Sequence, residues 1–459
     1  MSTDSSETRF NRWAAPAGFG AHPDFLGDFN RYRENIGTAR WKKLLGEKVS
    51  LSALADPRHP EVFIIPRDRH LSVIDEWGDV IGFFQTGFPF SSTDFYADLL
   101  EGKGVFGELF HCNPFYRLGD IAQLGYLVPP RPDDWLDDQR IAYVIPPFKH
   151  TRWIHSLVAA ILMEVILARN GFSEKEKAPV VLTVACHDVA MPAGGDSVKR
   201  VDPKNLDEEE NFSLVMEQSG LVESWVERFG FQLDLAQQWV RGEGLFGRIL
   251  DVVDKLSYTA LDCYAIGMER PGKIRSLCTA YPLIMDVWQD IRFTEDRTAF
   301  AFTNAQRLSN FILLRAYEYD EFLFNPYSRA FDLFLKKKVQ PLYDSGAVTK
   351  KDLLTQGDSW LHGVLRQDYP WEIKAYIEPD LLAWRRVGTK EEADKIQAEL
   401  GDSFEHSELI SGFNLCLDWP VFRGSEIVPL REEISQEQVR MLEDIVEGTK
   451  GYYVYYVRG

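Results

Sequence analysis

Three apolar stretches of the sequence each contain one or two residues that could bind a metal ion. His155 lies in "HTRWIHSLVAAILMEVILARNG", the pair His187-Asp188 ends the apolar run of "VVLTVACHDVAMPAGG", and Asp254 lies in "LDVVDKLSYTALDCYAIG". Imidazole nitrogens and carboxylate oxygens suit a divalent cation such as Mn, Fe, Zn or Mg. Together these side chains would form a site with two histidines and two carboxylates for one divalent metal ion.

The pair His187-Asp188 can reach one ion only if the helix that carries it ends or bends there. The following "VAMPAGG" supplies such a break, because Pro192 cannot continue a helix. Arg152 lies one helical turn before His155, so its guanidinium would enter the same cleft. An arginine in that position could hold a phosphate through forked contacts.

The polar residues of "LDVVDKLSYTALDCYAIG" fall on one stripe of a predicted helix. They are Asp251, Asp254, Lys255, Tyr258 and Asp262, and the last four follow the first by three, four, seven and eleven positions. Such a stripe is either the solvent face of the helix or the lining of a polar cleft. The spacing alone favours the solvent face, because charged stripes usually face water, whereas the combination with the two histidines favours a cleft.

Four motifs in order resemble the HD-domain phosphohydrolases. Among these the chain is most similar to the deoxynucleoside triphosphate triphosphohydrolases of the sterile-alpha-motif/HD type. The matching residues are Gln123-Leu124-Gly125, Arg152 with His155-Ser156-Leu157, His187-Asp188, and Asp254-Lys255 with Tyr258 and Asp262. Each motif alone is weak, but all four in this order are specific. The resemblance covers about residues 115–330, which is less than half of the chain.

The resemblance implies that a deoxynucleoside triphosphate is hydrolysed to a deoxynucleoside and triphosphate by attack of water on the α-phosphorus. One divalent metal ion and cationic side chains would stabilise the charge that gathers on the phosphoryl oxygens. The implied roles are as follows: His155, His187, Asp188 and Asp254 hold the metal; Arg152 and Lys255 contact phosphates; Gln123 and Leu124 border the sugar; Tyr258 and Asp262 contact sugar and phosphate; and Tyr317 helps to grip the substrate.

The chain departs from this family at the residues that would assist proton transfer. Met191 and Asp196 stand where the family has two histidines, and Glu209-Glu210 replaces a His-Glu pair. Asp196 or Glu209 could act as the catalytic acid if burial raised its pKa. Both could equally be exposed loop residues, because "DPKNLDEEEN" has the composition of a solvated segment.

A second departure concerns the grip on the triphosphate. In "RLSNFILLRAYEYDEF" only Tyr317 has a clear counterpart, while Ser309 and Leu313 replace charged family residues and Arg307 and Arg315 lie nearby. A nucleoside monophosphate or a phosphodiester is therefore an alternative substrate. A further alternative is an HD module that senses nucleotides with weak or no turnover. The set of four candidate metal ligands argues against this last alternative, because burying carboxylates and imidazoles together without a cation costs free energy of folding.

The elements that must position these residues are mostly helices. Helices are predicted over 151–171, with Thr151 as N-cap and Asn170-Gly171 as the stop, and over 246–267 and 301–324. Residues 177–190 have the β-branched content of a buried strand, but their place between helices favours a buried helix. A β-hairpin with a turn at 77–79 is predicted over 61–85.

The predicted fold class is mainly α: an HD-domain helical core with a small N-terminal β-hairpin region and a C-terminal α+β appendix. The predicted regions are 1–114, 115–335 and 336–459. In the last region we expect a helix over 391–402 and strands over 371–379, 411–422 and 451–459.

Composition limits the partners. The net charge of −19 argues against an extended nucleic-acid surface, although a local basic pocket for a small anion is compatible with it. The sequence begins without a secretory signal and contains no membrane-spanning stretch, and its five scattered cysteines form no CxxC motif. We therefore expect a cytoplasmic protein with a small nucleotide substrate and no membrane partner. The resemblance adds the expectation of a homo-oligomer.

Overall fold

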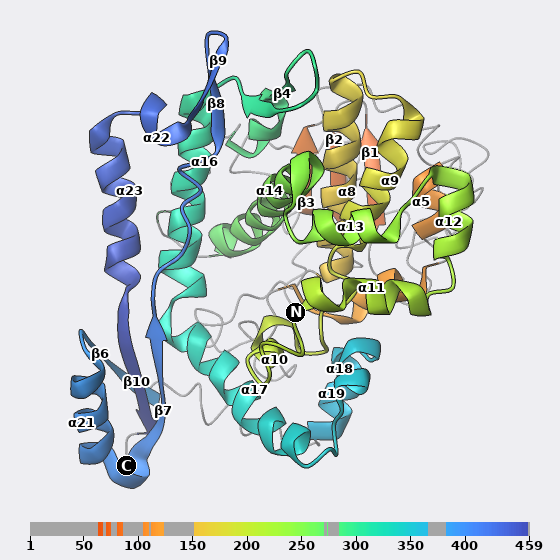
Figure 1. The fold of residues 1–459 in the computed structure, drawn as a ribbon. Helices are drawn as coiled ribbons and strands as arrows, with labels where there is room; N and C mark the ends of the chain where they lie inside the picture. Colours follow the sequence, from red (N-terminus) through yellow and green to blue (C-terminus); the bar gives the residue numbers. More distant parts are fainter. Residues whose placement is uncertain are drawn as a thin grey trace, which may run out of the picture.

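The structure is a computed structural model that describes residues 63–67, 70–74, 80–85, 104–109, 112–123, 151–269, 273, 284–365 and 382–457. Helices dominate these residues, and three small sheets accompany them (Figure 1). The predicted mainly-α fold class with a C-terminal α+β region is confirmed. The predicted strand over 371–379 and residue Leu124 lie outside the described residues. None of the described helices combines the length and the apolar character needed to cross a membrane.

The helical elements follow one another along the whole described chain. Their bounds are α5 Gly104–Leu109, α6 Asn113–Arg117, η2 Leu118–Asp120, α8 Arg152–Arg169, α9 Glu174–Cys186, α10 Gly195–Lys199, α11 Glu208–Gln218, α12 Val222–Phe229, α13 Leu233–Val240, α14 Gly244–Glu269, η5 Ile284–Asp290, α16 Ala305–Glu318, η6 Tyr319–Leu323, α17 Pro326–Asp344, α18 Lys350–Thr355, α19 Asp358–Leu365, α21 Lys390–Leu400, η7 Gly401–Ser403, α22 Leu430–Glu433 and α23 Gln436–Thr449.

The strands form three separate sheets. Their bounds are β1 Phe63–Arg67, β2 His70–Ile74, β3 Val80–Gln85, β4 Ile291–Phe293, β5 Phe300–Phe302, β6 Leu382–Val387, β7 Phe404–Ile410, β8 Pro420–Arg423, β9 Glu426–Pro429 and β10 Gly451–Val457. The strand orders are β1-β2-β3, β6-β10-β7 and β4-β5-β8-β9. All pairs are antiparallel except β5 and β8, which meet in parallel at Phe302 and Val421.

Two strand predictions and one helix prediction need correction. The segment 61–85 contains three strands instead of one hairpin, because β1 adds to the β2–β3 pair that flanks the predicted turn. The strand predicted over 411–422 is restricted to β8, and residues 411–419 form an irregular segment. The predicted helix over 301–324 starts only at Ala305, because its first residues belong to β5. In both latter cases tertiary pairing between β5 and β8 decides the structure.

The helices that carry the candidate site form because local signals and burial agree. The helix α9 starts at a capping box between Ser173 and Glu176 and ends at Cys186, so His187 and Asp188 lie in the turn that follows. The preceding helix α8 starts directly after Thr151, which bridges Ala122. This bridge places the end of η2 beside the first turn of α8.

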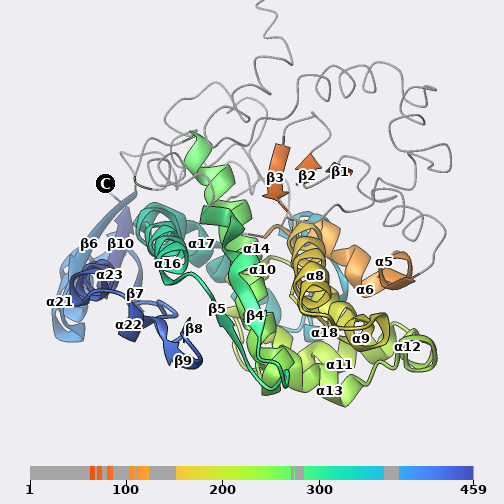
Figure 2. The same ribbon diagram turned by 90° about the horizontal axis from the view of Figure 1, so that it is seen from above.

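Helices α8, α9 and α14 lie side by side at the centre of the molecule (Figure 2). Their shared core consists of aliphatic side chains such as Leu157, Val181 and Val253, all nearly or fully buried. Close packing of α13 against α14 depends on Gly247, because a Cβ there would lie 2.5 Å from the main-chain carbon of Gly242. The long helix α14 packs against α8, which in turn packs against α9.

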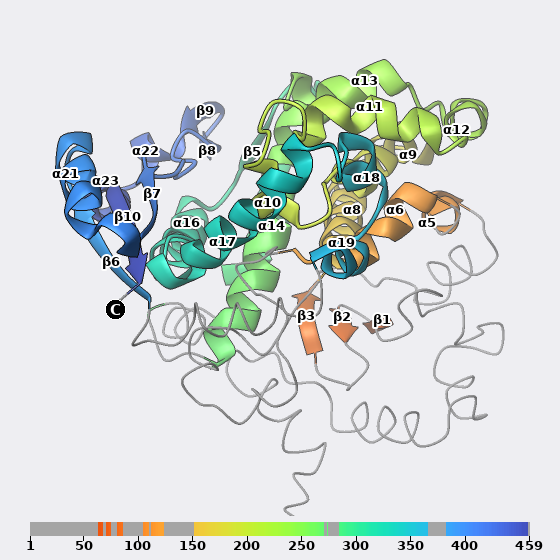
Figure 3. The same ribbon diagram turned by 90° about the horizontal axis from the view of Figure 1, so that it is seen from below.

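The remaining helices enclose this centre. Seen from below, α17, α18 and α19 lie across the side that carries α10 (Figure 3). The C-terminal sheet β6-β10-β7 lies beyond α17, and α23 runs along α16 (Figure 1). A second, smaller core joins the sheet to α17 through Ala330, Leu333, Ile410, Tyr453 and Tyr455.

Candidate metal centre and substrate cleft

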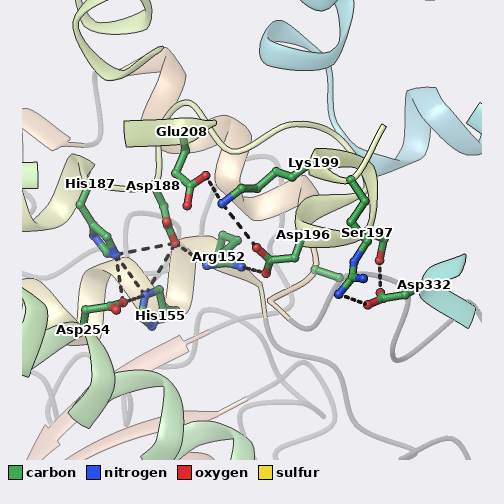
Figure 4. A network of polar contacts seen from close by, with 12 residues as sticks. Arg152, His155, His187, Asp188, Asp196, Ser197, Lys199, Glu208, Asp254 and Asp332 are labelled. Carbon is green, nitrogen blue, oxygen red and sulfur yellow. Dashed lines mark hydrogen bonds and ion pairs between the residues drawn. The ribbon is translucent and has the colours of Figure 1, made fainter. Parts of the chain in front are cut away.

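Three side chains from α8, the turn after α9, and α14 bring their ligand atoms together, namely those of His155, His187 and Asp254, and Asp188 lies beside them (Figure 4). The Nε2 atoms of His155 and His187 are 3.2 Å apart. They lie 3.0 and 3.3 Å from Asp254 Oδ1, and 3.6 and 3.7 Å from Asp188 Oδ2. Ligand atoms bonded to one cation at about 2.1 Å are separated from each other by about 3.0–3.4 Å, so the separations among His155, His187 and Asp254 fit a shared ion. Asp188 lies slightly farther from both imidazoles than this range.

The outer sides of both imidazoles fix which nitrogen faces the centre. Ser257 Oγ donates its proton to the main-chain oxygen of His155 at 2.9 Å, so at 3.1 Å it accepts from His155 Nδ1. His187 Nδ1 donates to the carbonyl oxygen of Val184 at 2.6 Å. With both Nδ1 atoms protonated, the neutral imidazoles direct two Nε2 lone pairs at each other and at two carboxylates. Such a group of acceptors is stable only around a positive charge.

When no cation is bound, the positive charge at this point is a proton on His187, as its raised pKa indicates. Burial acts to lower the pKa of His187, but Asp188 and Asp254 outweigh it and raise the pKa to about 9. Burial keeps the pKa of the fully buried His155 below its usual value despite the same two neighbours. The two imidazoles contact the same carboxylates, so one proton on His187 is shared by the pair. A metal ion would displace this proton.

Both carboxylates of the centre are held ionised. Burial alone would raise the pKa of Asp188, but Arg152 and the two imidazoles lower it to about 2. Burial is likewise outweighed at Asp254, where hydrogen bonds from His155 and His187 hold the pKa well below its usual value. The residues therefore fit a divalent cation: two neutral imidazoles, two carboxylates and outer partners that orient the rings.

Arg152 joins the metal centre to a second group of charges. Its Nη1 donates to Asp188 Oδ2 at 2.9 Å and its Nη2 donates to Asp196 Oδ2 at 2.6 Å. Asp196 belongs to α10, which also carries Lys199, and Lys199 pairs with Glu208 at the start of α11. The guanidinium is buried, and its forked contacts place it at the edge of the metal centre, as the sequence predicted.

Glu208 is the acidic residue that the sequence analysis missed. Burial, together with Asp196 and Asp188, raises its pKa to about 7 against the opposite effect of Lys199. Its neighbour Glu209 also lines the cleft but is exposed, and Asp196 pairs with Arg152. Three consecutive glutamates look alike in the sequence, and only the direction of the first turn of α11 separates them.

These groups surround a cleft with a volume of about 340 Å³. The stripe on α14 lines it through Asp251, Asp254, Tyr258 and Asp262. The expectation that this stripe faces solvent, which the spacing alone favoured, is therefore wrong. Lys255 is not among the lining residues and pairs with Asp251 instead.

The other predicted substrate residues divide into two groups. Gln123 is buried, follows the Ala122–Thr151 bridge and lines the cleft. Tyr317 does not line it: its ring lies 4.6 Å from Lys273 Nζ, beside the core. Tyr319, two residues further along, lines the cleft in its place. Tyr317 lies within the regular helix α16, whereas Tyr319 is the first residue of the π-helical turn η6 that follows it.

One wall of the cleft is held by a buried arginine from α16. Arg315 Nε donates to Tyr258 Oη at 3.0 Å, and its Nη2 donates to Tyr319 Oη at 3.3 Å. Its Nη1 donates to the carbonyl oxygen of Asn414 at 2.5 Å, in the irregular C-terminal segment. The ring of Tyr319 stacks on Phe413 at 4.3 Å between centroids. The C-terminal region therefore contributes to the shape of the cleft.

A pair of buried carboxyl groups lies at the end of the cleft. Burial raises the pKa of Asp262 to about 8, and it raises that of Glu318 well above its usual value. The two side chains contact each other, and Glu318 also accepts a hydrogen bond of 2.9 Å from Thr259 Oγ1. A carboxyl pair of this kind holds at least one proton at neutral pH.

Two residues without any sequence signal position the turn after α9. Arg117 donates to the carbonyl oxygens of Val189 and Met191 at 2.8 and 2.5 Å. Asp358, the first residue of α19, accepts from the main-chain nitrogens of Gly194 and Ala122 at 2.7 and 3.0 Å. Both act across more than 70 positions of the chain, so no local pattern could have identified them.

Solved structures with a similar fold include two bacterial proteins. A hypothetical protein from Aquifex aeolicus has 17% sequence identity and a TM-score of 0.55, and the match covers 76% of this chain and 91% of that chain. A phosphohydrolase from Bacteroides thetaiotaomicron has 17% identity and a TM-score of 0.53, with 78% and 96% covered. No protein-family model and no curated protein matches the chain. At this identity the similarity demonstrates a shared fold.

Proposed function

We propose that the protein is a metal-dependent phosphohydrolase of the HD-domain superfamily that acts on nucleotides. The observation that carries the proposal is the convergence of His155, His187 and Asp254 on one point. Asp188 lies beside both imidazoles and links this point to the buried guanidinium of Arg152. The four sequence motifs support it, and so does the fold shared with a phosphohydrolase. A divalent cation held there would stabilise the negative charge that develops on phosphoryl oxygens.

The residues around this centre have separate tasks. Arg152 is oriented by Asp188 and Asp196, so its remaining hydrogen-bonding capacity can position a phosphoryl group next to the centre. Glu208 holds a proton near neutral pH and can donate it to the leaving oxygen. We assign the acid role to Glu208 in preference to Glu209 and Asp196. The Glu208 side chain lines the cleft and is only 15% exposed, whereas that of Asp196 is 56% exposed and Glu209 is exposed.

The favoured substrate from the sequence motifs is a deoxynucleoside triphosphate. One observation favours a less charged substrate, such as a nucleoside monophosphate or a phosphodiester. Among the described residues, the cleft is lined by two permanently cationic side chains, those of Arg152 and Arg241, by the imidazole of His187, and by seven carboxyl groups. The seven are those of Asp188, Asp196, Glu208, Glu209, Asp251, Asp254 and Asp262. A triphosphate would meet strong repulsion unless further cations accompanied it.

The test combines product analysis with metal analysis. The purified chain is incubated with Mn²⁺ or Mg²⁺ and with nucleoside mono-, di- and triphosphates. Triphosphate release supports the first substrate, and orthophosphate from monophosphates supports the second. Stoichiometric metal without turnover of any nucleotide would contradict enzymatic function and leave the sensing alternative.

Two variants test the metal centre itself. We expect His187→Ala and Asp188→Ala to lose both bound metal and turnover, because each removes a converging ligand atom. His362→Ala, which removes an imidazole outside the cleft, is the matched control. Thermal unfolding of each variant distinguishes loss of the centre from loss of the fold. Full metal content in either ligand variant would disprove the site.

A further inference from the structure

A second cavity, of about 540 Å³, lies between the end of α10, α17 and β7. Its lining includes Arg200 after α10, Arg329 and Lys336 on α17, and His406 and Glu408 on β7. None of these residues lines the cleft of the metal centre. The cavity is therefore a separate feature, formed where the C-terminal sheet meets the helical body.

The charges around the cavity are unevenly paired. Arg329 makes close hydrogen bonds to two carboxylates: its Nε lies 3.1 Å from Glu408 Oε1 and its Nη1 lies 3.1 Å from Asp332 Oδ2. Arg200 is left with the same two carboxylates at 3.5 Å, which is long for a charge-assisted hydrogen bond. Lys336 has no ion-pair partner among the described residues.

Three permanent cations thus share two carboxylates. His406 is not counted, because burial and the neighbouring cations lower its pKa against the effect of Glu408. The cavity therefore has an excess of positive charge in a protein whose net charge is −19. A small anion would supply the missing negative charge, and it would hydrogen-bond the loosely held guanidinium of Arg200 and the ammonium of Lys336.

The other lining residues indicate that the ligand is larger than a single inorganic ion. Ser407 and Ser411 add hydroxyl donors, while Phe324, Leu333 and Ile410 form an apolar wall. Guanidinium, ammonium and hydroxyl donors together match the several oxygens of a phosphate group. The apolar wall and the volume leave room for a ring beside that phosphate.

We propose that this cavity is a second ligand site, which binds a small molecule carrying a phosphate group through Arg200 and Lys336. The site requires neither the metal centre nor turnover. It can therefore be tested with the cation removed, independently of the proposed function.

The test is calorimetric titration of the full chain in EDTA with inorganic phosphate, pyrophosphate and AMP. We expect all three to bind, and AMP most tightly because its base can contact the apolar wall. Lys336→Glu should weaken binding by about tenfold or more, because it replaces an attractive charge by a repulsive one. Lys337→Glu is the matched control, since Lys337 is exposed, pairs with Glu405 and does not line the cavity.

A second variant keeps the proposal testable if Lys336→Glu fails to fold. Ser411 is exposed at the cavity, so Ser411→Glu adds a carboxylate there without disturbing the core. It should weaken the same binding by a similar factor. The proposal is overturned if none of the three probes binds, or if Lys336→Glu has no larger effect than Lys337→Glu.

Discussion

Each imidazole of the metal centre is oriented by a different partner. His155 uses a serine hydroxyl, whereas His187 uses the carbonyl oxygen of Val184 in the last turn of α9. The helix ends at Cys186, and Asp188 follows in the turn that places it beside both imidazoles. The adjacent histidine and aspartate therefore depend on the end of α9.

The proton on His187 makes metal affinity depend on pH. Its pKa of about 9 in the cation-free protein means that metal and proton compete below that pH. Because the deprotonated form binds metal, apparent affinity should rise by about tenfold per pH unit between pH 6 and 8. Competition titrations of Mn²⁺ or Zn²⁺ across this range measure the slope. A flat profile would show that no proton is displaced.

Glu208 should control the pH dependence of turnover. A group that donates a proton must be protonated, so activity should fall as pH rises through about 7. Glu208→Gln should lower kcat by about 100-fold and remove this limb of the profile. Glu209→Gln is the matched control on the same helix turn, and we expect little change. Equal losses in both variants would contradict the assignment.

At the scale of elements, the short helix α10 depends on one glycine. Gly194 precedes it with a φ of +85°, and a Cβ there would contact Val198 and lie 3.0 Å from Leu361 Cδ2 and 3.1 Å from Leu335 Cδ2. Its main-chain nitrogen donates to Asp358. The geometry of this glycine therefore sets the direction in which Asp196 approaches Arg152.

Gly194→Ala should lower the free energy of unfolding by about 2–4 kcal/mol, from backbone strain plus overpacking. Gly220→Ala is the matched control, because Gly220 has a φ of +71° with nothing within 4 Å of the added Cβ. Gly220→Ala should lower the free energy of unfolding by the backbone strain alone, about 1 kcal/mol. Urea unfolding followed by circular dichroism gives both values. Equal decreases in the free energy of unfolding for Gly194→Ala and Gly220→Ala would show that the packing around α10 is loose.

The sequence predicted elements better than their relative positions. Helical periodicity identified α8 and α14, and the histidines and carboxylates of the candidate metal centre stood out as polar exceptions, because both are local signals. The lining role of the α14 stripe and the identity of the acidic residue at α11 required knowledge of which faces meet. The same holds for Arg117 and Arg315, whose partners are distant main-chain oxygens.

At the scale of the whole molecule, the C-terminal sheet is attached to the helical body by one buried ion pair. Arg329 and Glu408 are 9% and 8% exposed, and Tyr455 Oη donates to the same carboxylate at 3.1 Å. The smaller core of α17 and the sheet surrounds this contact. The ion pair and this core together hold the C-terminal sheet on α17.

Arg329→Leu should destabilise this attachment by about 3 kcal/mol, because Glu408 and Asp332 would lose their close cation and keep only Arg200, at 3.5 Å. Hydrogen exchange should accelerate in β6, β7 and β10, while metal content stays unchanged. Lys337→Ala, which breaks only the more exposed pair with Glu405, should have little effect. Unchanged exchange in the Arg329 variant would contradict the role of this pair.

The five-residue helix α10 has contacts in two directions. Asp196 pairs with Arg152 of the metal centre, whereas Ser197 and the following Arg200 contact Asp332 on α17. Any compound that shifts α10 by binding on one side must alter binding on the other, and thermodynamic reciprocity makes the two effects equal in free energy. Selection for tighter substrate binding would then also change the response of the protein to a compound that never touches the substrate.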